Sequence, residues 1–307
     1  MKKNSALFPR NAVCSTIGTE IISPILNIEN SMGEIIKVLK FIASSGEPEF
    51  GYRSSIHVHV SFPIVRLKTL KNIIRLAANY EVLAYYIGGM GYKFRGEKND
   101  SIYCRPITLW GPACIKINKQ AAQIFTIKSL LAAKTINEFW ENYGDTYRHN
   151  SRYNNPARYC WINLLPLFKK KEENRTLEFR IFNKTLNPEY IMAAIKWCLE
   201  FAKMADNSLK RIALNERSIF SYGKETALKL ADEFCSLSGN LDYERKILYS
   251  IIKRTREINL KKGYVFTHKR GLEPFWERGN YLPDLIDTEN VRYPQYVDIH
   301  ILRGERG

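Results

Sequence analysis

The feature that most constrains the fold is the strict alternation of polar and apolar residues in SIHVHVSF, residues 55–62. Residues two apart share one face of a β-strand, so this pattern predicts a strand with two unlike faces. One face carries His57 and His59 between two serines. The other carries four apolar residues suited to packing on helices: Ile56, Val58, Val60 and Phe62.

Two further segments show the same division. In RTLEFRIF, Glu178 and Arg180 share one face, and three apolar residues share the other: Leu177, Phe179 and Ile181. In STIGTEIIS, Glu20 shares a face with Gly18 and Ile22. An antiparallel sheet with one solvated face gives such alternation without any chemistry, and for a single strand this is the favoured interpretation. Two histidines, two glutamates and an arginine on such faces together favour a binding or catalytic site over a merely solvated face.

These residue types suit one kind of chemistry. Carboxylate oxygens and a neutral imidazole can hold a divalent cation, and Mg²⁺ usually completes its shell with water and substrate phosphates. A second imidazole and a guanidinium can bind phosphate oxygens and developing negative charge. Zinc would prefer more histidine or cysteine ligands. The strand faces therefore predict a magnesium and phosphate site.

The rest of the chain predicts helices between the strands. Apolar residues at helical spacing predict helices over 31–46, 66–89, 119–133, 135–144 and 187–205, the last with Asn187 as its N-cap. Strands are expected over 12–23, 54–62, 157–168 and 175–183. Later helices are expected over 224–237 and 243–260, before a tail without periodicity. We predict an α+β region over 1–206 and a mostly helical extension over 207–307.

Charge and cysteine content restrict the class of protein further. The net charge of +16 favours anionic partners such as nucleotides, polyphosphates, nucleic acid or acidic peptides. The six cysteines form no CxxC pair, which argues against a zinc ribbon or a redox motif, and buried reduced thiols are expected. No run approaches the roughly 18 apolar residues of a spanning helix, and no signal peptide is recognisable. A cytoplasmic location is expected.

The ordered motifs resemble a known family. GTEII (18–22), HVHVS (57–61) and TLEFR (176–180) follow one another as in the amidoligases of the glutamine synthetase-like superfamily, which also includes relatives of glutamate–cysteine ligase. YCRP (103–106) and RYCWINL (158–164) are similar to amidoligase segments, though less specific. The resemblance covers roughly residues 12–200. It implies a glutamine synthetase-like antiparallel sheet with a polar active face, and helices packed on the other face.

The resemblance also implies an activity. Such enzymes transfer the γ-phosphate of ATP to a substrate carboxylate, and an amine then attacks the acyl phosphate to form an amide. Mapped by motif, Glu20, His57 and Glu178 would hold Mg²⁺, with Mn²⁺ as a possible substitute. His59 and Arg180 would contact the phosphates or the transferring phosphoryl group as cofactor-binding and catalytic residues.

Three further residues are carried over on weaker motifs. Arg158 and Arg105 are candidates for additional phosphate or carboxylate contacts, and Arg158 is also a catalytic candidate. Asn163 is a candidate for the nucleotide pocket. Trp161 and Tyr159 lie two and four residues before it, so they either share its face or pack as ordinary aromatic residues. The carboxylate and the amine substrates, small molecules or peptides, are not named by the sequence.

One position departs from the family pattern. The family has a second glutamate two residues after the first, and here that position is Ile22. Glu29, Glu47 or Glu49 could replace the missing carboxylate, fewer metal ions could bind, or catalysis could be impaired. Since phosphoryl transfer depends on positioning and charge neutralisation, the loss of one ligand matters.

Three alternatives stay open from sequence alone. An impaired ligase-like protein could bind nucleic acid or another anionic partner through its basic surface. A metal-dependent hydrolase also uses H-x-H on a strand, but this chain lacks the regular βα alternation of a barrel. A phosphotransferase that acts on nitrogen would share the ligase chemistry and differ in its product.

Overall fold

The computed structural model describes residues 21–44, 55–88, 107–108, 115–117, 120–122, 127–143, 160–183, 185–207, 212–217 and 222–255. Helices and strands are mixed along these residues without a regular alternation, and every described strand pairs in antiparallel fashion. The predicted α+β class with an antiparallel sheet is confirmed. The glutamine synthetase-like architecture stays a prediction, as does the boundary between residues 206 and 207.

The central sheet brings together segments that are far apart in the sequence. It contains β1 (Ser55–Ser61), β5 (Thr176–Asn183) and β4 (Ile162–Asn163) in the order β1-β5-β4, so β5 lies in the middle. The residues predicted for the packing face are buried: Ile56, Val58 and Val60 of β1, and Phe62 directly after it. A separate described pair consists of β2 (Ile115–Ile117) and β3 (Gln120–Ala122).

The middle strand contains a β-bulge that the sequence pattern did not predict. Two residues of β5, Arg180 and Ile181, lie opposite the single residue His57 of β1. A bulge shifts the alternation of the side chains by one residue beyond it. Strict alternation predicts Phe182 on the polar face, yet its ring lies 6.3 Å from that of Trp197 in the core. Phe182 therefore joins the core next to Ile181, which is buried against Gly88 as its predicted place on the packing face requires.

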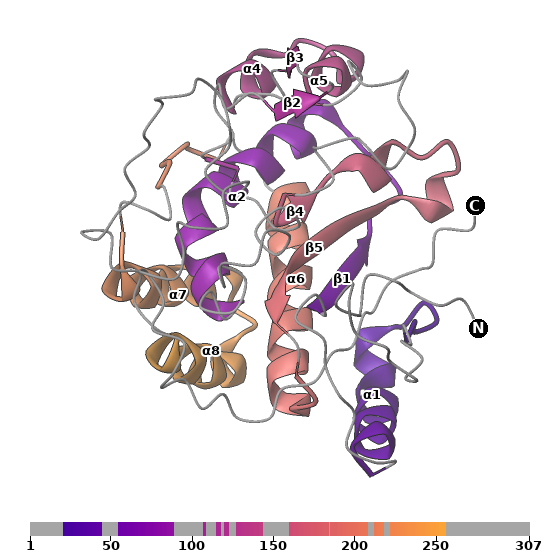
Figure 1. The fold of residues 1–307 in the computed structure, drawn as a ribbon, viewed down its shortest axis with the longest axis vertical. Coiled ribbons are helices and arrows are strands. Elements are labelled where there is room, and N and C mark those ends of the chain that lie inside the picture. Colours follow the sequence, from indigo (N-terminus) through magenta and orange to yellow (C-terminus); the bar gives the residue numbers. More distant parts are fainter. Residues whose placement is uncertain are drawn as a thin grey trace.

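Two long helices cover the apolar face of the sheet. α2 (Leu67–Ile87) contacts β5, and α6 (Pro188–Asn207) contacts both β1 and β5 (Figure 1). Asn187 is the N-cap of α6, as predicted, since its Oδ1 accepts hydrogen bonds from the backbone N–H groups of Glu189 and Tyr190. Trp197 of α6 lies 5.9 Å from Phe179 between ring centroids. These aromatic rings fix the sheet against the helix.

The helices after residue 207 pack on the first ones. α7 (Lys224–Ser238) lies against α2, and α8 (Asp242–Arg254) lies against α6 and α7 (Figure 1). The Tyr80 hydroxyl of α2 donates to Glu233 of α7 at 2.9 Å, and Lys196 of α6 pairs with Glu244 of α8 at 2.5 Å. α1 (Ile28–Ser44) contacts α6. The predicted helix at 224–237 is therefore confirmed, and the helix predicted over 243–260 is confirmed up to Arg254, where α8 ends before its C-cap Thr255; residues after 255 lie outside the described part.

Three sequence predictions are wrong in part. Residues 120–122, predicted as helix, pair as β3, and the helix of that region is the shorter α4 (Ile127–Ala132), followed by α5 (Ile136–Tyr143). Of the strand expected over 157–168, the structure describes residues 160–168, where Cys160 forms a bridge and Ile162–Asn163 form β4. A 3-10 turn follows at Leu165–Phe168, because Pro166 has no N–H to continue a ladder. Residues 21–23 of the strand expected over 12–23 lie in no strand, and residues 12–20 are outside the described part.

The cysteine and membrane predictions can be compared in part. The described cysteines, Cys160, Cys198 and Cys235, are buried and form no disulfide, as expected. Within the described residues, no helix combines the length and the apolar composition needed to cross a bilayer. The cytoplasmic location stays a prediction.

We expect Gly88→Ala to destabilise the protein. Gly88 caps the C-terminus of α2, and a Cβ atom there would lie 2.5 Å from the backbone oxygen of Ile181, at the bulge. Since backbone cannot move aside easily, the free energy of unfolding should fall by about 1–3 kcal/mol. Gly33→Ala is the matched control, because nothing lies within 4 Å of its Cβ position in α1 and alanine favours a helix. Urea denaturation that gives equal midpoints for both variants would contradict this packing.

Candidate active site

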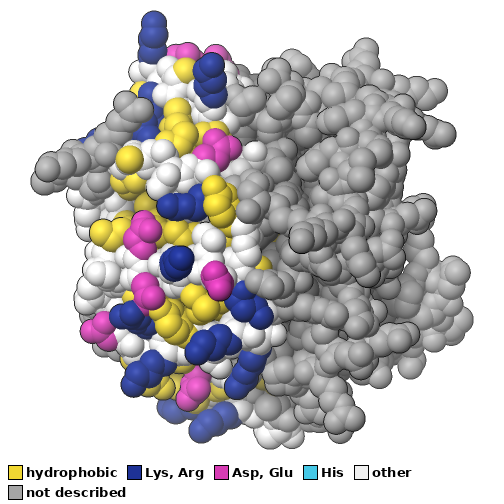
Figure 2. All heavy atoms as spheres, turned by 90° about the vertical axis from the view of Figure 1, so that its left-hand side faces the viewer, with side chains coloured by type: hydrophobic (Ala, Val, Ile, Leu, Met, Phe, Trp, Pro, Cys, Tyr) yellow, Lys and Arg dark blue, Asp and Glu magenta, His cyan; other side chains and the backbone are white. Residues whose placement is uncertain are grey.

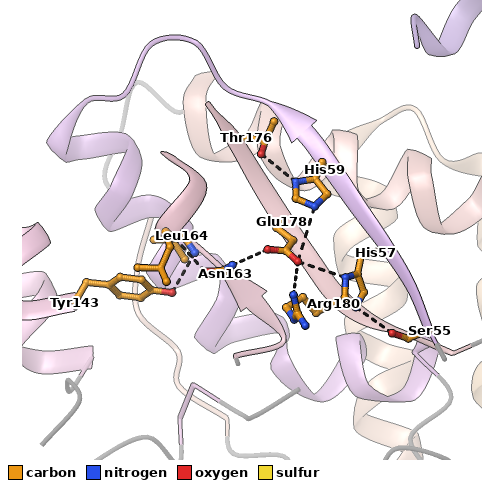
Figure 3. Close-up of polar contacts among 10 residues, drawn as sticks. Ser55, His57, His59, Tyr143, Asn163, Leu164, Thr176, Glu178 and Arg180 are labelled. Atoms are coloured by element: carbon orange, nitrogen blue, oxygen red, sulfur yellow. Dashed lines mark hydrogen bonds and ion pairs between the residues drawn. The ribbon is translucent and has the colours of Figure 1, made fainter. Parts of the chain in front are cut away.

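A buried carboxylate, Glu178, lies at the centre of the polar residues on the sheet. Its residue is 4% exposed, and it lies on β5, between the neighbouring strands β1 and β4 (Figure 3). Arg180, two residues along the same strand, donates from Nη1 to Glu178 Oε1 at 2.5 Å. Burial of a charge is costly unless the charge is paired and hydrogen-bonded, so Arg180 is required for an ionised Glu178 at this position.

The two histidines of β1 turn toward the same carboxylate oxygen. His57 Nδ1 lies 3.4 Å from Glu178 Oε1, and His59 Nε2 lies 3.8 Å from it (Figure 3). His57 is buried, whereas the side chain of His59 is 22% exposed. The sequence prediction that His57, His59, Glu178 and Arg180 share a polar face therefore corresponds to one cluster of side chains.

Hydroxyl groups hold the other nitrogen of each ring. The Ser55 hydroxyl lies 3.0 Å from His57 Nε2, and the Thr176 hydroxyl lies 3.0 Å from His59 Nδ1 (Figure 3). The remaining ring nitrogen of each histidine consequently points toward Glu178. The sequence analysis did not single out Ser55 and Thr176 as site residues. Each lies two residues from a candidate residue on the same strand, Ser55 from His57 and Thr176 from Glu178, and this spacing could have identified them.

Asn163 fixes the second oxygen of the carboxylate. It lies opposite Glu178 in the ladder between β4 and β5, and its Nδ2 donates to Glu178 Oε2 at 2.6 Å. Its own Oδ1 accepts the Leu165 N–H at 3.0 Å. The Tyr143 hydroxyl of α5 accepts the N–H of Leu164 at 3.0 Å, and burial raises the pKa of Tyr143 well above its usual value (Figure 3). The end of β4 is thereby fixed, and Asn163 with it.

These partners determine the charge of Glu178. Burial alone would raise the pKa of the carboxyl, but the Arg180 charge, the hydrogen bond from His57 and the charges of His59 and His57 outweigh it. The pKa of Glu178 is held well below its usual range, so the carboxyl is ionised at neutral pH. The site is an anion surrounded by four nitrogen-bearing side chains, those of His57, His59, Asn163 and Arg180.

The pair of Glu178 and His57 fits a divalent cation in donor type and separation. Two ligand atoms about 2.1 Å from a metal, at an angle of about 90–110°, lie about 3.0–3.4 Å apart. His57 Nδ1 and Glu178 Oε1 are 3.4 Å apart. Within the described part of the chain, no three or more His, Cys, Asp or Glu side chains are grouped to hold a metal. Glu20, the third predicted ligand, lies outside the described residues.

Comparison with known proteins agrees with the motifs of the sequence. A family model described as "Putative amidoligase enzyme" matches residues 2–202. The chain belongs to this amidoligase family. The matched range contains all three strands of the central sheet and most of α6. No curated protein and no solved structure gives a significant match.

The candidate residues of the chain fall into two groups. Five of them form the cluster described above: His57, His59, Asn163, Glu178 and Arg180. Arg105 and Arg158, like Glu20, lie outside the described residues, as do Tyr159 and two of the three substitute glutamates, Glu47 and Glu49. Glu29 is described only as part of α1. Of the two possibilities left open for Trp161, the structure selects packing, because its ring is buried against Phe179 and Trp197.

The described surface bears on the predicted anionic partner. Figure 2 faces the side of the molecule on which α7 and α8 lie, and among the described residues there lysine and arginine side chains alternate with acidic and hydrophobic ones. Two cations of α6 and α8 are paired with acids, Lys196 with Glu244 and Arg245 with Asp232. The nucleic-acid partner stays a prediction.

We expect Glu178→Ala to lower the free energy of unfolding by about 3–5 kcal/mol, because it removes the carboxylate that pairs with the buried Arg180. Glu172→Ala is the matched control, since Glu172 is 69% exposed and pairs with Arg175 at the surface. The control should change stability by less than about 1 kcal/mol. Urea denaturation at neutral pH measures both, and equal losses would show that the pair with Arg180 contributes little.

The same carboxyl should make stability depend on acid. A pKa below the unfolded value means that Glu178 contributes stability above the unfolded pKa, and that this contribution is lost as the pH falls through the folded pKa. Wild type should therefore lose stability on acidification from about pH 4.5 downward more steeply than Glu178→Ala does. Parallel acid titrations of the unfolding free energy would contradict the depressed pKa.

Proposed function

We propose that this amidoligase is an ATP- and Mg²⁺-dependent carboxylate–amine ligase that forms an amide or isopeptide bond through an acyl phosphate. The observation that carries the proposal is the buried, ionised Glu178, which gathers two histidines and an arginine on adjacent strands. Its family supports ligase chemistry. In this reaction a substrate carboxylate oxygen attacks the γ-phosphorus and ADP leaves. The amine nitrogen then attacks the acyl carbon, phosphate leaves, and the nitrogen loses a proton.

The proposed metal ligands are Glu178, His57 and Glu20. The donor types suit Mg²⁺, with Mn²⁺ as a substitute, and the bound ion would neutralise phosphate charge during the transfer. Asn163 keeps Oε2 of Glu178 engaged, so that the Oε1 atom is the one that faces the histidines. Ser55 holds the His57 ring with Nδ1 toward that oxygen. These contacts preserve the orientation of the ligand atoms before the ion arrives.

His59 and Arg180 are the proposed phosphate contacts. The His59 side chain is the more exposed of the two histidines, and the guanidinium of Arg180 can bind phosphate oxygens with several donors. The Nη1 atom of Arg180 donates to Glu178, and this hydrogen bond orients the guanidinium. Arg105 and Arg158 are proposed for further phosphate or substrate carboxylate contacts. Fixed cations near the transferring group would stabilise its developing charge.

Thermal unfolding tests nucleotide binding. We expect wild type to be stabilised by ATP with Mg²⁺, and not by ATP with EDTA, because the site would bind ATP as its complex with Mg²⁺. Ligand at about 100 times its Kd adds about 2.7 kcal/mol, a shift of about 4 °C at the unfolding entropy of a protein of this size. Glu178→Gln, which keeps the shape of the side chain, should lose the shift. Lys229→Gln, which removes an exposed cation of α7, should keep it.

A trapping experiment tests the chemistry. Hydroxylamine can replace the amine, so that a carboxylate substrate should yield a hydroxamate, ADP and phosphate in equal amounts. Screening carboxylates by ADP release, with ³¹P NMR of the products, separates a ligase from a phosphotransferase, whose product would carry a phosphorus–nitrogen bond. Nucleotide binding in wild type without ADP formation from any carboxylate and amine would instead indicate the impaired ligase-like protein.

A further inference from the structure

A second buried carboxyl lies on α2, away from Glu178. Glu81 is fully buried and accepts four hydrogen bonds. The N–H of Ile107 donates to Oε2 at 2.5 Å, and the indole Nε1–H of Trp161 donates to the same atom at 2.9 Å. The N–H of Thr108 donates to Oε1 at 3.3 Å, and the Thr108 hydroxyl donates to that atom too. One side chain thus ties two distant segments to α2.

Trp161 connects Glu81 to the candidate active site. The indole is held by Glu81, and the backbone oxygen of Trp161 accepts the backbone N–H of Arg180 at 2.7 Å. Arg180 is one of the two bulge residues of β5, and its guanidinium binds Glu178. Asn163, two residues after Trp161, binds the other oxygen of Glu178. Trp161 is therefore joined to both sides of the carboxylate.

The second tethered segment leads to another candidate residue. Ile107 and Thr108 follow Arg105 by two and three positions in the chain. Both of their backbone N–H groups point at Glu81. The carboxyl therefore fixes the chain directly after the residue to which the proposed function assigns a phosphate or carboxylate contact.

We propose that Glu81 is a positioning residue of the active site. Its carboxylate holds Trp161, and through Trp161 it holds the backbone of Arg180 where the guanidinium meets Glu178. The proposal rests on the proposed function only in taking the Glu178 cluster as the active site. Glu81 itself lies away from the reacting groups and acts through its neighbours.

The ionisation of Glu81 supplies a readout. Burial raises its pKa to about 7, against the opposing effect of the hydrogen bonds from Thr108, Ile107 and Trp161. All four donors are uncharged groups, and an ionised carboxyl accepts from all of them, whereas a protonated one could keep them engaged only if the Thr108 hydroxyl turned to accept its proton, and its neutral oxygens are weaker acceptors. A protonated carboxyl would place its own proton among these donors. The hydrogen bond from the Trp161 indole to Glu81 should therefore weaken as the pH falls through about 7.

The experiment compares wild type, Glu81→Gln and Tyr80→Phe. Tyr80 precedes Glu81 on α2, but its hydroxyl points to Glu233 of α7, so Tyr80→Phe removes a hydrogen bond of the same helix without touching Trp161. ¹⁵N-labelled tryptophan gives an indole signal for Trp161, followed from about pH 5.5 to about pH 8.5. Amide hydrogen exchange, analysed by mass spectrometry and expressed as protection factors, measures how often the backbone of β5 opens. Isothermal titration calorimetry with ATP and Mg²⁺ measures the affinity of the candidate active site.

We expect the Trp161 signal to titrate near pH 7 in wild type and in Tyr80→Phe, and not in Glu81→Gln. Protection of β5 should fall about tenfold in Glu81→Gln and stay unchanged in Tyr80→Phe. Affinity for ATP with Mg²⁺ should fall in parallel with protection. If Glu81→Gln does not fold, wild-type protection factors of β5 at pH 6 and pH 8 test the same link, and they should be lower at the acidic value.

Two results would overturn the proposal. One is β5 protection in Glu81→Gln equal to that in Tyr80→Phe, which would make Glu81 a structural carboxyl only. The other is a Trp161 signal that stays constant across the titration. A wild type that does not bind ATP would refute the proposed function instead, and the exchange and indole measurements would still decide the role of Glu81.

Discussion

The central sheet is organised around one ionised carboxyl in its middle strand. A buried carboxylate is tolerated only where its oxygens are paired, and here the partners of Glu178 come from all three strands. Arg180 comes from β5 itself, His57 and His59 from β1, and Asn163 from β4. Any other register of these strands would leave a charge in the interior without its partners. The charge therefore specifies the pairing of the strands, while the apolar face supplies the stability.

The apolar half of the molecule keeps these polar groups in place. Trp161, Phe179 and Trp197 pack between the sheet and α6, and α2 closes against the bulge at Gly88. The Tyr190 hydroxyl of α6 donates to the backbone oxygen of Ile87 at 2.8 Å, next to that close approach. Side chains on such a scaffold have few alternative rotamers. A site whose charges must be aimed before a ligand arrives benefits from that rigidity.

The sequence predicts the parts of this arrangement that depend on local pattern. Alternation placed the two histidines of β1 and Glu178 on polar faces, and Asn187 and Pro188 marked the start of α6. The bulge was not predictable, because strict alternation and a one-residue shift fit TLEFRIFN equally well. The assignment of residues 120–122 failed because pairing with β2 overrides a helical pattern. Glu81 was missed since a single acid on a helix resembles an exposed residue until its tertiary partners are known.

The strand order has a consequence for how the chain folds. β1 cannot pair until β5 is available, because Thr176 of β5, the partner of His59, lies 117 residues further along the chain. Closing so long a loop costs entropy that no local contact returns, so the sheet should assemble late and slowly. During synthesis the amphipathic β1 segment would remain unpaired until the ribosome has released β5. The helices α2 and α6, whose contacts are local within each helix, can form earlier and offer the surface on which the sheet condenses.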